Sequence, residues 1–174
     1  LKSTFSPNRY ISPSSALCTP VITLIKVDLP APDIFFGNDK MEVTDTDIYK
    51  SDQAFTQGQM ITVTGIDNLN EWWIDPDFFE KQSDGALKFL PINGDYRVTA
   101  NAVLKYFSVM ALKDGKPAKL QDDGTGAIWA IGKGIGKPSV TSSEVGWEPS
   151  KALCLAQVAS KKYQLTLKAG ETLK

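Results

Sequence analysis

Tryptophan side chains are the residues of this sequence whose type and placement most clearly suggest chemistry. Trp72 and Trp73 are adjacent in a polar segment, and Trp147 follows a segment of similar character. A flat indole ring can cover the apolar C–H face of a sugar at low entropic cost, and its N–H can donate to a hydroxyl. Because neighbouring residues of an extended chain point to opposite sides, one ring of the pair should face inward and the other outward. The chemistry predicted is sugar stacking.

A competing interpretation is that all four tryptophans are packed, with loops folded over the edge of a sheet. Trp129 lies inside a predicted strand and is expected to belong to the core. Sequence alone leaves this alternative open for Trp72, Trp73 and Trp147.

Carboxylates accompany the tryptophans, which raises the question of catalysis. A glycoside hydrolase needs two carboxylates about 5–10 Å apart on either side of the sugar. The sequence does not give that separation, and acidic residues in a loop are usually solvated. Histidine is absent, which excludes a histidine-containing triad or dyad. We therefore predict no enzyme activity. The carboxylates concerned are Asp67, Glu71, Asp75, Asp77 and Glu80.

Metal and cofactor sites are not predicted either. Asp122 with Asp123, and Asp75 with Asp77, offer oxygen ligands but follow no recognised calcium-loop spacing. Gly136-Lys137 is followed by proline rather than by serine or threonine, so it does not match a phosphate-binding loop. Cys18 and Cys154 are expected to be unpaired buried thiols, although pairing between them stays open.

Bulk composition excludes several partners. The chain has 174 residues, a formal net charge of -1 and 42% hydrophobic residues. A near-neutral chain without a basic stripe has little electrostatic reason to bind nucleic acid or an anionic membrane. Its apolar runs are also shorter than the roughly 18 residues of a membrane span, so no membrane insertion by this segment is expected.

Short strands separated by Gly and Pro turns predict an all-β fold made of tandem immunoglobulin-like sandwiches. Residues 1–20 are rich in Ser and Pro and indicate an extended arm. The predicted elements are a strand at 21–27, a loop or helical turn at 45–51, a hairpin joining 87–92 to 96–100, a strand at 106–112, a flexible loop at 134–139, and paired strands at 151–158 and 162–167.

Two parts of the sequence resemble each other at an offset of about 67 residues, a spacing typical of tandem small domains. Ile61-Thr62-Val63-Thr64-Gly65 corresponds to Ile128-Trp129-Ala130-Ile131-Gly132, and Tyr96-Arg97-Val98-Thr99 to Tyr163-Gln164-Leu165-Thr166. This predicts a first module at 21–122 and the start of a second at 127–174. The second copy looks incomplete, so we expect a piece of a longer protein. Unpaired strand edges would favour a homodimer or a disordered C-terminal part.

The second copy resembles the β-sandwich modules of SusE/SusF-like outer-membrane lipoproteins of Bacteroidetes. The resemblance is carried by 128–132, the Gly-rich turn after it, Val145-Gly146-Trp147, Ala152-Leu153 and 162–166. It covers 127–174 well and 60–120 more loosely. It departs at Lys133, where the family often has Asp, and in the absence of the module's later strands.

The resemblance implies a non-catalytic protein that binds polysaccharide at the cell surface, in a polysaccharide-utilisation system, with its lipid anchor outside this segment. It suggests Trp147, Trp72 and Trp73 as stacking platforms, and charge and position suggest that Lys133, Lys137 and Glu144 hydrogen-bond sugar hydroxyls. The alternative function is a structural or adhesive immunoglobulin-like module that mediates protein–protein contacts.

Overall fold

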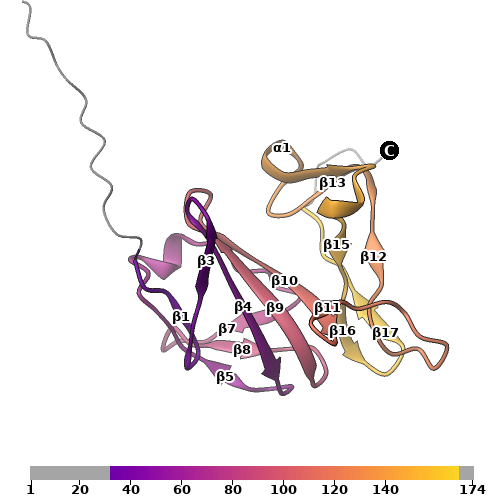
Figure 1. Cartoon of the computed structure of the whole chain (residues 1–174), viewed down its shortest axis with the longest axis horizontal. Helices are drawn as coiled ribbons and strands as arrows, with labels where there is room; N and C mark the ends of the chain where they lie inside the picture. Colours follow the sequence, from indigo (N-terminus) through magenta and orange to yellow (C-terminus); the bar gives the residue numbers. More distant parts are fainter. Residues whose placement is uncertain (1–31, 169–174) are drawn as a thin grey trace, which may run out of the picture. The chain divides into compact units, whose positions relative to one another are not determined.

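The computed structural model describes residues 32–168, which are built almost entirely of antiparallel β-strands (Figure 1). This confirms the predicted all-β class. The predicted arm at 1–20, the strand predicted at 21–27 and Cys18 lie outside the described residues. Within residues 32–168, every helix is too short and too polar to cross a membrane.

The largest sheet has the strand order β11-β10-β9-β4-β3. Its register aligns Tyr49 with Ala100 and Ala100 with Phe107, and all three side chains are buried. Alternate residues of the three long strands therefore face one core, as the two-residue period of a strand requires. The strands are β3 (Glu42–Asp45), β4 (Ile48–Phe55), β9 (Gly94–Asn101), β10 (Tyr106–Lys113) and β11 (Lys116–Pro117).

Two three-stranded sheets supply the residues that pack against this core. Phe36 of β1 lies 5.4 Å, between ring centroids, from Phe107 of β10. Phe89 of β8 lies 4.9 Å from Tyr96 of β9. These contacts between sheets are those of a sandwich with an aromatic interior. The sheets are β2 (Asp39–Lys40), β1 (Phe35–Phe36) and β6 (Val63–Thr64), and β5 (Met60–Ile61), β8 (Leu87–Phe89) and β7 (Phe79–Lys81).

The C-terminal segment forms three two-stranded ladders. Ala127, Cys154 and Ala156 are buried in the same hydrophobic cluster as the aromatic residues of the larger sheets. The segment therefore shares a core with the preceding strands. The ladders are β12 (Trp129–Ala130) with β15 (Leu153–Cys154), β13 (Gly132–Gly136) with β14 (Glu144–Gly146), and β16 (Ala156–Ala159) with β17 (Lys162–Gln164).

Three short helices complete the described elements. They are the 3-10 turns η1 (Leu69–Glu71) and η2 (Pro149–Lys151) and the single α-helical turn α1 (Val140–Ser143). Both α1 and η2 lie in connections between strands of the C-terminal segment.

The predicted hairpin between 87–92 and 96–100 is wrong. β8 pairs with β5 and β7, whereas β9 pairs with β4 and β10. The chain passes from one sheet to another at Pro91, which has no backbone N–H to donate. Its neighbour Ile92 donates instead to the carbonyl of Gln157, at 2.8 Å. The Asn-Gly signal therefore marks a crossover.

Two segments predicted as loops belong in part to strands. Residues 45–51 contain a tight turn, with Asp47 at φ 59°, that leads into β4. The polar surface of β4 obscured its buried alternation of Tyr49, Ser51 and Phe55. In the Gly-rich segment, residues 134–136 belong to β13, which pairs with β14. Residues 137–139 connect β13 to α1. The predicted strand at 106–112 and the pairing of β16 with β17 are confirmed.

Candidate functional site

A groove of about 530 Å³ lies between β10, the segment after Trp72 and the C-terminal ladders. Its aromatic lining comes from Trp73, Tyr106 and Trp129, and its charged lining includes Asp75, Lys137 and Glu144. Aromatic rings beside converging polar groups make this groove the candidate ligand site, although its lining is more polar than that of most small-molecule pockets.

Backbone contacts at the edge of β10 orient the two adjacent tryptophans. The N–H of Trp73 donates to the carbonyl of Lys105 at 2.8 Å, which holds this segment in extended form beside the start of β10. Trp72 is then directed inward: it is 6% exposed, and its ring stacks on Phe107 at 5.0 Å and 29°. Trp73 is half-buried and lines the groove. Trp72 was suggested as a stacking platform, but its ring is buried in the core.

Tyr106 and Trp129 reach the groove from two different strands. Tyr106 is one residue out of phase with the buried Phe107, so its side chain faces the other side of β10. Trp129 packs against the hydrophobic core, as expected, but it is half-buried and also reaches the groove. Its Nε1 donates to the carbonyl of Ala118 at 2.9 Å, which fixes the indole against the groove wall.

The polar wall of the groove begins at α1. The Ser139 side chain caps this turn by accepting from the N–H of Ser142 at 3.3 Å, and Ser139 and Ser142 hydroxyls lie 2.9 Å apart. Glu144, the next residue after α1, is exposed and accepts from the N–H of Gly134 at 3.0 Å. Serine hydroxyls and a carboxylate thus stand together along this wall.

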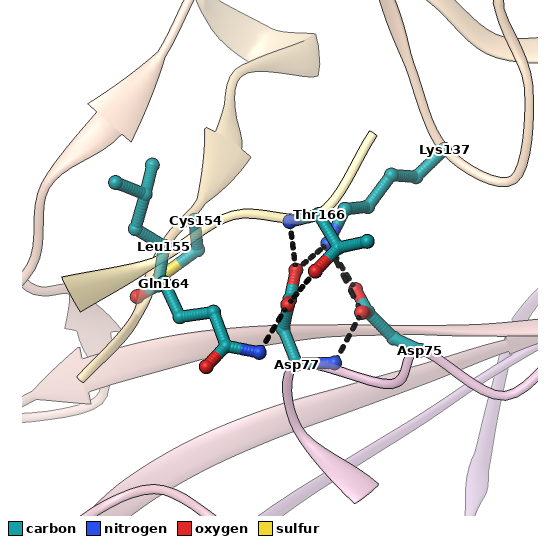
Figure 2. A network of polar contacts seen from close by, with 7 residues as sticks. All are labelled: Asp75, Asp77, Lys137, Cys154, Leu155, Gln164 and Thr166. Atoms are coloured by element: carbon teal, nitrogen blue, oxygen red, sulfur yellow. Dashed lines mark hydrogen bonds and ion pairs between the residues drawn. The ribbon is translucent and has the colours of Figure 1, made fainter. Parts of the chain in front are cut away.

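A buried ion cluster forms the groove's floor at Lys137 (Figure 2). The Lys137 side chain is 8% exposed, and its ammonium contacts both oxygens of Asp75, at 3.0 and 2.9 Å, as well as Asp77. Three contacts match the three donors of an ammonium group. The sequence suggested sugar hydroxyls as partners of Lys137, whereas in the structure its partners are two carboxylates.

Asp77 joins the cluster to the C-terminal strand segment, as Figure 2 shows. Its carboxylate is fully buried and accepts from the Gln164 amide at 2.9 Å, and from the N–H and hydroxyl of Thr166, each at 2.6 Å. Asp75 holds the turn from the other side by accepting from the N–H of Asp77 at 3.0 Å. Residues about 60 to 90 positions apart are therefore fastened through one carboxylate.

The two carboxylates differ in their titration. Burial raises the pKa of Asp75, although Lys137 acts in the opposite direction. Burial would also raise the pKa of Asp77, but hydrogen bonds from Lys137 and Thr166 outweigh it and hold that pKa below its ordinary value. The charge of the cluster is thus best stabilised at Asp77.

Cys154 borders the groove as an unpaired, buried thiol, as expected for this position. Burial raises the pKa of its thiol to about 11, so it is protonated at neutral pH and is a poor nucleophile. Residues 32–168 contain no group of three or more Cys, Asp or Glu side chains arranged to hold a metal ion.

Trp147 lies apart from the groove lining. It follows β14 and is 69% exposed, which contradicts the interpretation that all four tryptophans are packed. Glu144 and Ser150, three residues to either side of it, both line the groove. Its Cα is thus within about 11 Å of a groove residue on each side, from the 3.8 Å spacing of successive Cα atoms.

Three of the suggested residues, Trp73, Lys137 and Glu144, line one groove, whereas Trp72, Trp147 and the exposed Lys133 do not. Sequence reasoning missed Tyr106 as a groove residue. Its signal was the phase of β10, in which Tyr106 alternates with Phe107. The contact between Asp77 and Thr166 left no signal in the sequence, because it joins residues 89 positions apart.

Comparison with protein families gives two matches. Residues 23–120 match the family described as Domain of unknown function (DUF5125), and residues 123–173 match Domain of unknown function (DUF5121). Comparisons with curated proteins and with solved structures gave no match. Because the first match spans more than half of the 174 residues, the chain belongs to the DUF5125 family.

Proposed function

We propose that this chain is a non-catalytic glycan-binding part of a cell-surface protein. The observation that carries the proposal is the groove itself, which combines the rings of Trp73, Tyr106 and Trp129 with hydroxyl and carboxylate groups. Rings offer area to the C–H faces of a sugar, and the polar wall offers hydrogen bonds to its hydroxyls. Lys137 then acts as a positioning residue that holds the floor.

Trp147 supplies a further stacking surface outside the groove. Its exposed indole lies in the connection between two segments that line the groove wall, so a polysaccharide leaving the groove can meet it. Trp72 has no contact role in this proposal, because its ring is stacked on Phe107 in the core.

Placement on the outer membrane, within a polysaccharide-utilisation system, is also part of the proposal. Its support is the resemblance of residues 127–174 to SusE/SusF-like modules together with the all-β fold. The lipid anchor of such a protein would lie outside this segment.

The test is a titration of the chain with soluble polysaccharides, followed by tryptophan fluorescence and by retardation in affinity gels. Saturable binding is expected for one glycan class. Trp73→Ala should reduce affinity about two- to ten-fold, since an aromatic stacking contact contributes on the order of 0.5–1.5 kcal/mol. Trp73→Phe should retain part of the binding. Absence of any response across the panel would contradict the proposal.

A protein-binding role is the second candidate, and one observation favours it. Ile131 and Trp147 are both exposed and flank the paired glycines Gly132 and Gly146 of the β13–β14 ladder. Exposed apolar side chains at one place can mark a protein contact. Concentration-dependent self-association that Trp147→Ala abolishes, without any glycan response, would favour this role over the first.

A further inference from the structure

We propose that the groove selects neutral glycans and rejects anionic ones, because its cations are already neutralised by the protein's own carboxylates. This inference rests on the proposed glycan-binding function and specifies its ligand class. Among residues 32–168, four charged residues line the groove: Asp75, Glu144, Lys137 and Lys151. Whether an anionic sugar can enter depends on what the two lysines already bind.

The charge of Lys137 is already paired with carboxylates of the protein and is therefore not free for an anionic ligand. Its ammonium is paired with both Asp75 and Asp77, and its side chain is 8% exposed. Recruiting it to a sugar carboxylate or sulfate would require breaking a buried ion pair, which leaves an uncompensated buried charge. The cluster of one lysine and two carboxylates also carries a net charge of -1.

Lys151 is also paired with a carboxylate, but at the exposed outer wall. It lies 2.8 Å from Glu148, the residue that precedes η2. Both side chains are solvent-exposed, so this pair is weak, but it balances the local charge. With Asp77 and Glu148 included, four carboxylates stand against two lysines, a net charge of -2 around the groove.

Glu144 is the remaining charged group on the wall. It is exposed, and the contact recorded for its carboxylate within residues 32–168 is the N–H of Gly134. A second carboxylate brought beside it would be repelled, whereas a sugar hydroxyl can donate to it in a charge-assisted hydrogen bond.

Neutral sugars fit the rest of the lining. Their C–H faces can lie on Trp73 and Tyr106, and their hydroxyls can donate to Glu144. None of these contacts needs a mobile cation. Binding should therefore depend little on ionic strength, in contrast to binding that relies on exposed charges.

The experiment compares neutral and anionic polysaccharides by calorimetry at pH 7. The neutral probes are glucan, mannan, xylan and galactan, and the anionic probes are polygalacturonate, alginate and sulfated galactan. Polygalacturonate before and after reduction of its carboxyl groups, and sulfated galactan before and after desulfation, form matched pairs. We expect binding to a neutral probe, and at least ten-fold weaker binding to every anionic probe.

Glu144→Gln tests the cause, because glutamine keeps an oxygen for the Gly134 N–H and removes the charge. The variant should narrow the difference between the members of a matched pair several-fold. Glu80→Gln is the control, since Glu80 is exposed on β7 outside the groove lining and the substitution changes the net charge equally.

Each outcome gives a decision. Tighter binding of an anionic probe than of its neutral partner would overturn the inference while leaving glycan binding in place. An unchanged discrimination in Glu144→Gln would overturn the role given to that carboxylate. Silence across both panels would contradict the proposed function itself, and the selectivity would fall with it.

Discussion

At the scale of single residues, exposure separates tryptophans that the sequence could not distinguish. Trp72 and Trp73 are adjacent and share one polar segment, yet one ring stacks on Phe107 and the other lines the groove. Alternation along an extended chain predicted that they would differ. It could not predict which ring faces inward, because that depends on the contact of Trp73 with Lys105 across the fold.

Truncation should destabilise the protein strongly at the core tryptophan and hardly at the surface tryptophan. Trp72→Ala should lower the free energy of unfolding by about 3–5 kcal/mol, because it leaves a cavity beside Phe107. Trp147→Ala should change it by less than about 0.5 kcal/mol, as expected for an exposed site. Urea unfolding followed by circular dichroism measures both. Equal losses would mean that Trp147 is packed.

The two aspartates of the ion cluster should give opposite slopes in the pH dependence of stability. The pKa of Asp77 is lowered on folding, so its charge adds stability that is present above the ordinary value of 3.8 and is lost as the pH falls through the folded value. The pKa of Asp75 is raised, so its charge costs stability above the folded value, and this cost is relieved as the pH falls through it.

Urea unfolding between pH 7 and pH 3 would test these slopes. As the pH falls below 3.8 the parent should lose stability through Asp77, and Asp77→Asn should reduce that loss. At pH values above 3.8 the parent should gain stability through Asp75 as the pH falls, and Asp75→Asn should remove that gain. The hydrogen bond to Arg97 lowers the pKa of Asp52, so Asp52 also contributes to the loss of stability at acid pH in every variant. Each variant is therefore compared with the parent. Parallel curves for both variants would contradict the assignment.

At the scale of elements, β10 was predictable from its apolar alternation, whereas β4, with its polar surface, and the short crossovers were not. β10 buries Phe107 and Val109 at alternate positions, and its prediction is confirmed. The Asn93-Gly94 turn signal was misread, because a local signal does not identify the sheet in which the next strand finds its partner. β13 was missed because three of its five residues are glycine, which gives a strand little side-chain signal.

Gly126 should tolerate alanine less than an equivalent turn glycine. A Cβ at Gly126, which has φ +91°, would lie 2.0 Å from the carbonyl oxygen of Lys119, whereas a Cβ at Gly115, which has φ +72°, would meet nothing within 4 Å. Both substitutions share a backbone cost of about 1–2 kcal/mol. Gly126→Ala should lose clearly more unfolding free energy than Gly115→Ala, measured in urea. Equal losses would mean that the 119–126 turn relaxes freely.

At the scale of the whole molecule, the two parts distinguished by sequence repetition share buried groups. Cys154 and Ala156 belong to the hydrophobic cluster of Phe36 and Phe107, and Asp77 holds Thr166. The repeat itself stays a prediction from the sequence. The contacts between the two parts could not be predicted, because they pair residues of unlike type at large separation.

Because the larger sheets and the C-terminal segment share a hydrophobic core and an ion cluster, we expect one cooperative unfolding transition for residues 32–168. Far-ultraviolet circular dichroism reports on the larger sheets, and fluorescence of Trp129 and Trp147 reports on the C-terminal segment. The Trp72→Phe, Trp73→Phe variant isolates this fluorescence. The two urea transitions should coincide. A separate, earlier fluorescence transition would show that the C-terminal segment unfolds by itself.

The seam between the two family matches, at residues 120–123, has a consequence for inheritance. Trp73, Tyr106 and Asp75 stand on one side of it, and Lys137, Glu144 and Trp129 on the other. Recombination at the seam would exchange half of a groove together with half of an ion cluster. Under the proposed function, ligand preference depends on both halves, so lineages that keep it would have to transmit both as one heritable unit.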